Sequence, residues 1–593
     1  MAILQNAQAE ELLTKQLNKT QILRAIEHEE RLILHCEPIQ HKDNLPQSYR
    51  RILGWIETLL TPDKFMRFQQ LLRTPIETVE STETIFDELS KLFQADDKFI
   101  KFDFVSNEIE EDANEYARKI KDSEFWETKG WDAMKTAVNS ILVVDLPAVQ
   151  TTERPEPYYY LVPICNVLDV CFDKECSKVE YIAYKQDEKT VIILDDWKFR
   201  TYVKKEDSDD YKLFAEAIHS TYTEAGDLIE GLGYCPAASF MGTPIEGSNG
   251  VDNKGPVSGS LSKLDWLLFW RTSKKYLDLY GAWPIFVTYK QKCDYKDEND
   301  NFCIEGYINY EETGAGGVFV PKQKPCPHCA QKSVIGPGSW WEVDPPADKD
   351  DVDLMKNPVH IVEISNDKLE YCVAETDRQE NEIYLDCVGW DGDAMANKAV
   401  NETQVAANFQ SKDNVLNRWK SVFERSRKFA MDTVYRLRYG DYFLRSTVNY
   451  GTEYFLQTPE QLTEQYNKAK TAGLPMYMLS GMRERIARTQ NRNNPEELER
   501  NFILAQLEPY PDLGIAQVAS MGIAQTDPAG YILKLNFPTF IQRFERENTN
   551  IIEFGSLIPF NTKIDIILQT LKDYGKEQQN SIPQPDPGPN AGA

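Results

Sequence analysis

The spacing of apolar residues changes several times along this chain, and each change limits which element can form there. From 9 to 36 the apolar residues recur near the 3.6-residue period of a helix. Further helical patterns follow around 48–73, 83–95 and 107–121. From 157 to 203, short runs of aromatic and β-branched residues alternate with polar breaks, which predicts a meander of antiparallel strands. The chain up to about residue 250 is therefore expected to be an α+β block.

Longer helical patterns lie beyond a Gly-, Ser- and Pro-rich connector at 242–259. They cover 260–281, 367–388 and about 396–439. The first has apolar residues on most faces, which favours packing between neighbouring copies in an oligomer. Residues 284–365 have the pattern of short strands and loops, and the chain from about 456 is mostly helical. The Pro- and Gly-rich end, 583–593, is expected to be disordered.

Composition excludes some classes of protein. The 593 residues are too many for one hydrophobic core, so several domains are expected. No window has the uncharged apolar length of a membrane span, and the charged N-terminus lacks the apolar stretch of a secretory signal, so we expect no membrane contact and a cytoplasmic start. The net charge of -28 is opposite to that of a protein that grips DNA tightly. It fits either simple solubility or a surface that must not adhere to nucleic acid.

The motifs of common enzymes are missing from the sequence. It has no HExxH pair, no GxSxG elbow and no dinucleotide-binding fingerprint. The glycines at Gly250 and Gly255 have P-loop-like spacing, but Pro256 and Val257 stand where Lys and Ser or Thr are needed. We therefore predict that the protein is not an enzyme.

One group of cysteines has the character of a metal site. Cys326 and Cys329 form a CxxC motif, and Cys293 and Cys303 lie upstream in the same loop-rich segment. Converging thiolates would suit a structural zinc ion, with His328 as a substitute ligand. The alternative is a set of reduced surface thiols; a redox CxxC is disfavoured by the prolines beside Cys326.

From about 155 to 510 the order of segments resembles the portal proteins of tailed bacteriophages. The resemblance is carried by the following segments: Tyr159–Val170 (YYLVPICNVLDV), Asn397–Phe409 (NKAVNETQVAANF), Asn414–Phe423 (NVLNRWKSVF), Leu474–Gly481 and Asn494–Pro511 (NPEELERNFILAQLEPYP). It implies an α+β portal-like fold with a wing, a helical stem, an inserted clip, a tunnel loop and helix, and a helical crown. The expected ranges are 1–257 for the wing, 258–283 for the first stem helix, 284–365 for the clip, 366–389 for the second stem helix, 390–455 for the tunnel loop, tunnel helix and return to the wing, 456–582 for the crown, and 583–593 for the tail. A clip that is long and carries a CxxC departs from the family pattern.

The resemblance also implies roles for residues in the tunnel segment. Trp390, Asp391, Asp393 and Asn397 would form the tunnel loop, whose acidic tip would repel DNA phosphates. Arg418, Arg425, Arg427 and Lys428 line the helix that follows. We expect these basic residues to pair with acidic residues such as Glu424 and Asp432 of neighbouring subunits and not with DNA. An ordinary helix–helix connection is the alternative for the loop.

The resemblance implies a non-enzymatic ring of about twelve copies at one vertex of the capsid, assembled in the host cytoplasm. Such a ring is a virion component that seeds head assembly and conducts double-stranded DNA during genome packaging and ejection. Its partners would be copies of itself, the terminase motor, the major capsid protein and the neck or tail adaptors. Another virion connector or adaptor, or a zinc-containing nucleic-acid enzyme built on Cys326 and Cys329, is the alternative.

Overall fold

The computed structural model describes residues 3–15, 17–38, 54, 56–72, 76–95, 97–147, 150, 152–205, 210–283, 285–289, 293–313, 319–332, 340–343, 359–362, 365–389, 402–454, 459–491, 494–555 and 558–580. The chain divides into two compact units, Met1–Tyr454 and Phe455–Ala593. The mixed helix and sheet content confirms the α+β class. Among the described helices, none combines the length and the apolar character needed to cross a membrane.

Helices make up much of the N-terminal part of the first unit. They are α1 (Asn6–Leu12), α2 (Lys19–Cys36), α4 (Pro62–Gln70), α5 (Thr78–Leu89), α6 (Asn107–Lys119), α7 (Asp122–Phe125) and α8 (Trp131–Thr136), with a 3-10 turn at Ser90–Phe93 and a π-turn at Trp126–Gly130. Each predicted helical region overlaps at least one of these helices, although the observed bounds differ from the predicted ones.

The predicted strand meander is confirmed for 167–204, which forms four strands of a five-stranded antiparallel sheet in the order β4-β5-β6-β7-β8. The strand predicted at 158–162 belongs to another sheet instead, and the fifth strand lies beyond the predicted range. The strands of the five-stranded sheet are β4 (Val167–Phe172), β5 (Val179–Lys185), β6 (Thr190–Asp195), β7 (Lys198–Lys204) and β8 (Tyr211–Ile218). A second antiparallel sheet joins β2 (Ile141–Asp145), β3 (Tyr158–Val162) and β11 (Ala237–Ser239), and a short hairpin joins β9 (Ser220–Tyr222) to β10 (Leu228–Gly231).

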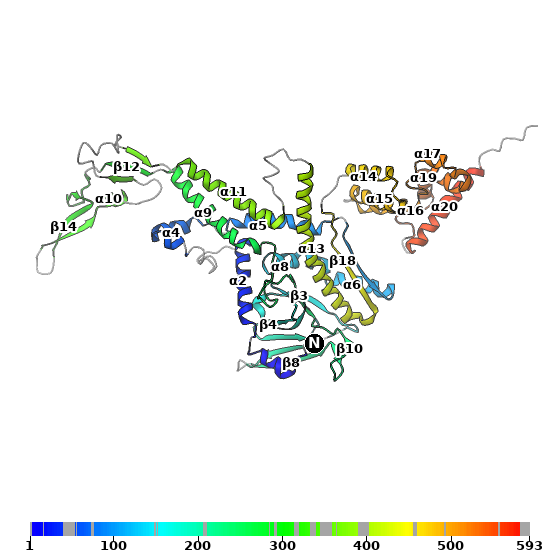
Figure 1. The fold of residues 1–593 in the computed structure, drawn as a ribbon, viewed down its shortest axis with the longest axis horizontal. Coiled ribbons are helices and arrows are strands. Elements are labelled where there is room, and N and C mark those ends of the chain that lie inside the picture. The colour runs from blue at the N-terminus through cyan, green and yellow to red at the C-terminus, as the bar shows by residue number, and fades with distance from the viewer. Residues whose placement is uncertain are drawn as a thin grey trace, which may run out of the picture. The chain divides into compact units, whose positions relative to one another are not determined.

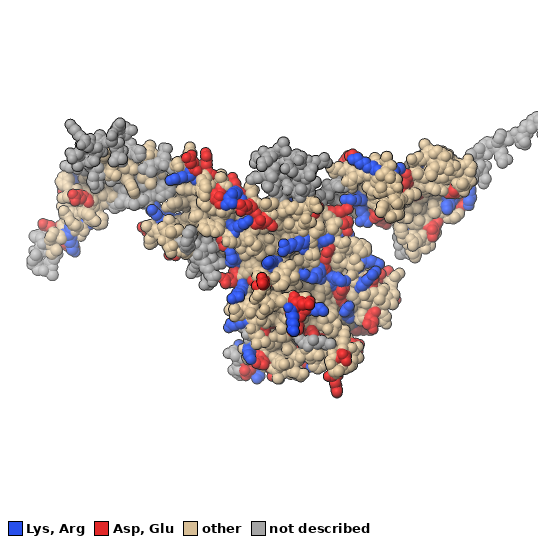
Figure 2. Space-filling view, viewed as in Figure 1, with Lys and Arg blue, Asp and Glu red and all other residues tan. Residues whose placement is uncertain are grey.

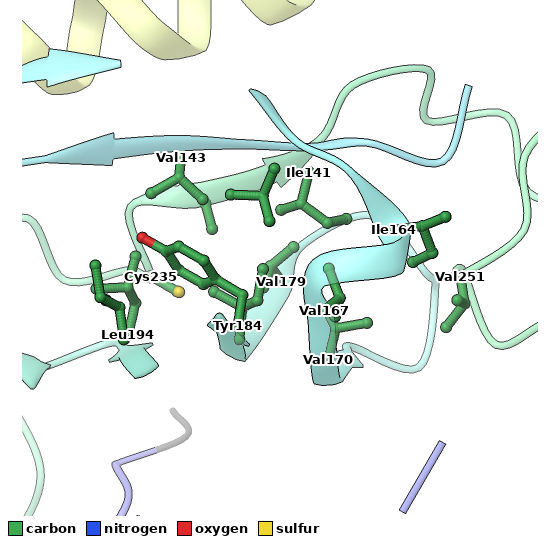
Figure 3. Packing of buried hydrophobic residues seen from close by; sticks show 14 of the residues in the cluster. Ile141, Val143, Ile164, Val167, Val170, Val179, Tyr184, Leu194, Cys235 and Val251 are labelled. Atoms are coloured by element: carbon green, nitrogen blue, oxygen red, sulfur yellow. The ribbon is translucent and has the colours of Figure 1, made fainter. Parts of the chain in front are cut away.

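The central strands of the larger sheet, β5 to β7, are buried on both faces, whereas the edge strand β8 is largely exposed. On one face, Val170, Ile182 and Leu194 pack with residues of the second sheet and of α2. Figure 3 shows Val170 and Leu194 in this cluster with Ile141 and Val143 of the second sheet. On the other face, the alternate residues of β5, β6 and β7 pack with Leu12 of α1. Because successive side chains of a strand point to opposite faces, nearly continuous apolar strands serve both cores.

This two-sided burial corrects the prediction of a single helix over 9–36. The helix breaks between α1 and α2, because Leu12 belongs to one face of the sheet and Ile22 to the other. At the break, the Asp169 carboxylate accepts hydrogen bonds from the backbone N–H of Asn18 (3.1 Å) and from its side-chain amide (3.2 Å).

Two helices form an antiparallel hairpin after the connector, as Figure 1 shows. The helices predicted at 260–281 and 367–388 are confirmed as α9 (Leu261–Ala282) and α11 (Asn366–Val388). Lys263 Nζ lies 2.6 Å from Asp386 Oδ2, and Arg271 lies 2.7 Å from Glu380 Oε1, which fixes the antiparallel register. The base of α9 also packs against α2 and α4 through an apolar cluster that includes Leu268.

The segment between these helices carries two small sheets. One has the order β16-β12-β17 and contains β12 (Ile285–Tyr289), β16 (Trp340–Val343) and β17 (Val359–Val362). The other contains β13 (Cys303–Ile304), β14 (Tyr307–Thr313) and β15 (Phe319–Pro325), followed by α10 (Pro327–Lys332). Since β12 follows α9, β17 precedes α11, and the two strands pair antiparallel, they join the two ends of the inserted segment.

The chain then returns to the N-terminal part of the first unit. The long helix predicted to about 439 is confirmed as α13 (Glu402–Tyr439), and β18 (Phe443–Asn449) pairs antiparallel with β1 (Phe99–Phe104). Apolar residues of this helix such as Leu416, Phe423 and Val434 are buried, whereas Phe409 is exposed. Residues 390–401 lie outside the described part of the chain.

The second unit is helical in its described residues. Its helices are α14 (Pro459–Thr471), α15 (Met476–Gln490), α16 (Pro495–Leu507), α17 (Ile515–Ser520), α18 (Ile523–Thr526), α19 (Pro528–Glu547) and α20 (Phe560–Asn580). Leu533, Phe544 and Leu571 belong to its core, which α16, α19 and α20 build. The predicted disordered tail, 583–593, lies outside the described residues.

A buried carboxyl in α2 makes stability depend on pH. Glu29 Oε1 accepts a hydrogen bond from the backbone N–H of Asn139 (2.7 Å), and burial raises the pKa of Glu29 to about 8. Because the folded-state pKa lies above the unfolded value, the folded state holds the proton more tightly. The resulting stabilisation is complete below the unfolded pKa and is lost as the pH rises through about 8.

We therefore expect Glu29→Gln, which keeps the acceptor oxygen and removes the titration, to melt at a temperature less sensitive to pH than the wild type. Thermal unfolding of both proteins between about pH 6 and pH 9 measures this difference. The advantage of the variant over the wild type should grow with pH. Parallel curves for the two proteins would show that Glu29 does not titrate in this range.

Candidate functional site

The structure brings together the four cysteines that the sequence singles out. Cys293 Sγ lies 3.9 Å from Cys326 Sγ, and Cys303 Sγ lies 3.6 Å from Cys329 Sγ. All four sulfur atoms lie within 4.8 Å of one another. In the described part of the chain, the other cysteines take no part in such a cluster. The predicted convergence of the thiols is therefore confirmed, and the group is able to surround one ion.

Short strands and tight turns position these thiols. Cys303 begins β13, Cys326 follows the end of β15, and Cys329 lies in α10. Gly306, three residues after Cys303, has a φ of 91°, a conformation that favours glycine. Its carbonyl oxygen accepts a hydrogen bond of 2.8 Å from the backbone N–H of Cys326, which ties the two cysteine turns together.

Hydrogen-bond donors surround the sulfur atoms. Burial by itself would raise the pKa of the Cys326 thiol, but the backbone N–H groups of Cys329 and His328 donate to its sulfur and, with the Cys303 thiol, lower that pKa overall. The His328 side chain is not the fourth ligand in this arrangement. Its Nδ1 lies 3.8 Å from Cys293 Sγ, at hydrogen-bond distance to a sulfur atom.

The predicted tunnel-loop residues Trp390, Asp391, Asp393 and Asn397 lie outside the described residues. The described chain before them ends with α11 at Val388 and its C-cap Gly389, which has the left-handed conformation.

The predicted basic residues of α13 have different surroundings. Arg418 is exposed, and its guanidinium lies 4.9 Å from the centre of the Trp419 ring. Arg425 donates a 3.2 Å hydrogen bond to the carbonyl oxygen of Phe240. Lys428 Nζ donates a 2.7 Å hydrogen bond to the carbonyl oxygen of Ser446, and it lies 3.3 Å from Asp432 of the same helix.

Arg427 corrects the expectation that this group pairs across subunits. Its side chain is only 4% exposed, and its Nε lies 3.0 Å from Asp122 Oδ2 of the same chain. The partner carboxylate is also 4% exposed, so both charges are enclosed within one subunit. Arg427 is therefore unavailable to a neighbouring subunit or to DNA.

Asp122 is the centre of a polar network that the sequence did not reveal. Its Oδ1 accepts hydrogen bonds from Trp126 Nε1 (3.0 Å) and from the Tyr159 hydroxyl (2.7 Å), while its Oδ2 accepts from Arg427. The pair joins residues 305 positions apart, and no local pattern signals a contact at that separation. The network connects α7, β3 and α13.

Replacing Asp122 with alanine should leave the Arg427 guanidinium buried without a counter-charge and destabilise the first unit by about 3–5 kcal/mol. Urea unfolding followed by tryptophan fluorescence measures the change. The matched control is Asp103→Ala, which removes a carboxylate 2.8 Å from the exposed Arg445 and should leave the curve nearly unchanged. Equal shifts in both variants would contradict a special role for the buried pair.

Comparison with known proteins adds no relative to this picture. No protein-family model matches the chain, and a search of curated proteins finds no significant match.

Proposed function

We propose that this chain is the subunit of a portal, a non-enzymatic ring at one capsid vertex through which double-stranded DNA enters and leaves a phage head. One observation carries the proposal: the order in which the chain leaves the N-terminal α+β part and returns to it. The chain goes out along α9, forms the inserted strands of 283–365, comes back along α11 and continues into the 38-residue α13. It then pairs β18 with β1.

In the portal, these elements take the parts that the resemblance implies. The N-terminal α+β part is the wing, α9 and α11 are the stem, and the inserted strands are the clip. The α13 helix follows the tunnel loop, and the helical unit that begins near residue 455 is the crown. The predicted crown start at 456 is adjacent to this division of the chain.

The charge of the chain suits a conduit. The stem helix α11 contains seven acidic and two basic residues, and Figure 2 shows acidic side chains along it. With a net charge of -28 per subunit, a ring of such chains repels phosphate and adheres weakly to DNA that passes through it. A protein that holds DNA in place needs the opposite charge.

The stem hairpin supplies surfaces for contact between subunits. Trp266 and Leu279 of α9 and Tyr371, Val373 and Leu385 of α11 are large apolar residues exposed in the single chain. A cyclic ring repeats one heterologous contact around its axis, so the α9 side of one hairpin would cover the α11 side of the next. Burial of this apolar area would favour assembly.

The remaining partners follow from the position of a portal in the virion. The major capsid protein would surround the ring, the terminase motor would dock during packaging, and neck or tail adaptors would replace the motor afterward. A different virion connector would share the ring but would not need the inserted segment. A zinc-dependent enzyme is disfavoured because the four cysteines would fill a tetrahedral site and leave no position for substrate or water.

The proposal predicts a closed ring of about twelve copies with an open centre, and therefore a particle of about 0.8 MDa, twelve times 68.3 kDa. Native mass spectrometry and two-dimensional class averages of the purified full-length protein measure mass and symmetry. A monomer or a closed dimer that persists when capsid protein is co-expressed would overturn the proposal.

The stem interface is tested by Leu385, which is 43% exposed on α11. Leu385→Glu should abolish or strongly reduce ring formation, because a carboxylate would be buried between subunits. Leu385→Met keeps an apolar side chain of similar volume and should assemble like the wild type. Sedimentation velocity separates rings from free subunits; normal assembly of both variants would exclude this face of α11 from the interface.

A further inference from the structure

The tip of the inserted segment, residues 293–329, has too little apolar core to hold its own shape. Of its described residues, Ile308 and Cys326 are the buried apolar ones. Phe302 and Ile304 are instead 57% and 59% exposed. Small modules of this kind usually need a disulfide or a metal ion for stability.

The distances between the sulfur atoms distinguish a metal site from disulfides. A disulfide requires a sulfur–sulfur distance of about 2.05 Å, much shorter than the 3.6 Å and 3.9 Å separations of the two closest pairs. Four sulfurs placed tetrahedrally at ~2.3 Å from one zinc ion are ~3.8 Å apart. The observed pairs lie on either side of that value.

We propose that Cys293, Cys303, Cys326 and Cys329 together bind one Zn²⁺ ion that holds the tip of the inserted segment in its folded form. Thiolates are soft ligands and select zinc over the oxygen-preferring cations. All four tetrahedral positions are occupied by protein, which makes the site structural and not catalytic. This inference stands whether or not the chain forms a ring.

The groups around the sulfurs suit a metal-bound thiolate cluster. Four thiolates and one Zn²⁺ carry a net charge of -2, which N–H donors directed at the sulfurs offset in part. Such donors come from the backbone of His328 and Cys329 toward Cys326, and from the backbone of Gly306 toward Cys303. His328 is a positioning residue: its Nδ1 is placed to donate to Cys293 Sγ, and its ring stacks on Tyr295 at a centroid distance of 6.4 Å.

The ion would connect four separate points of the tip. Cys293 precedes the strands, Cys303 begins the first of them, Cys326 follows the last, and Cys329 lies in the short helix. Loss of zinc should therefore unfold this tip. The core between the five-stranded sheet and the β11-β2-β3 sheet contains none of these residues and should stay intact.

The first experiment measures metal in the full-length protein, purified without chelator, by inductively coupled plasma mass spectrometry. We expect one zinc per chain, and less than about a tenth of that in the double variant Cys293→Ser/Cys326→Ser. The matched control is Cys165→Ser, which removes an exposed thiol outside the cluster and should keep the zinc. Iron in place of zinc, or metal that survives the double substitution, would overturn the proposal.

The second experiment tests the structural role on wild-type protein, so that it does not depend on how a variant folds. Removal of zinc with a chelator should make residues 293–329 sensitive to limited proteolysis, and zinc alone should restore resistance. Cobalt added in place of zinc should give the absorption bands of a tetrahedral thiolate site. Protection that is unchanged by chelation, or intact-mass data that show disulfides among these cysteines, would overturn the proposal.

Discussion

The buried pair of Asp122 and Arg427 is the contact on which the first unit most depends, because it closes the fold across the whole insertion. Asp122 precedes the hairpin in sequence and Arg427 follows it, 305 positions later. A charge pair buried on both sides tolerates little displacement, since each partner alone would carry a large desolvation cost. The chain can therefore extend into α9, the inserted strands and α11 only if it returns to this one place.

The antiparallel pairing of β18 with β1 also joins the chain before the hairpin to the chain after it, through backbone hydrogen bonds. Tyr435 of α13 packs edge-on against Phe102 and Phe104 of β1, with ring centres 5.0 Å and 5.1 Å apart. The aromatic contacts fix the rotation of α13 about its axis. The hydrogen bonds around Asp122 fix the position of α13 against α7 and β3. The packing of α9 against α2 and α4 holds the first helix of the hairpin at its base.

The sequence patterns predicted those elements whose formation depends mainly on residues close together in the chain. The meander, α9, α11 and α13 were predicted because apolar periodicity alone specifies them, and the cysteine spacing predicted the convergence of four thiols. The break between α1 and α2 was missed, because it depends on the two faces of a sheet that forms much later in the chain. Arg427 was misassigned for the same reason: its sequence neighbours Glu424 and Asp432 offered pairs, but tertiary packing brought Asp122 closer.

Several of the apolar clusters formed by the described residues of the first unit are separate from one another. One cluster lies between the sheets, another holds the base of α9, and the described residues of the tip of the insert include few buried apolar ones. Since none of the described buried residues of the tip belongs to the cluster between the sheets, a change of shape at the tip need not disturb the sheets. A partner that displaces the hairpin must also move the Leu268 cluster at its base. For a proposed portal that exchanges a motor for a neck, this division lets the tip adapt to successive partners while the ring-forming surfaces stay fixed.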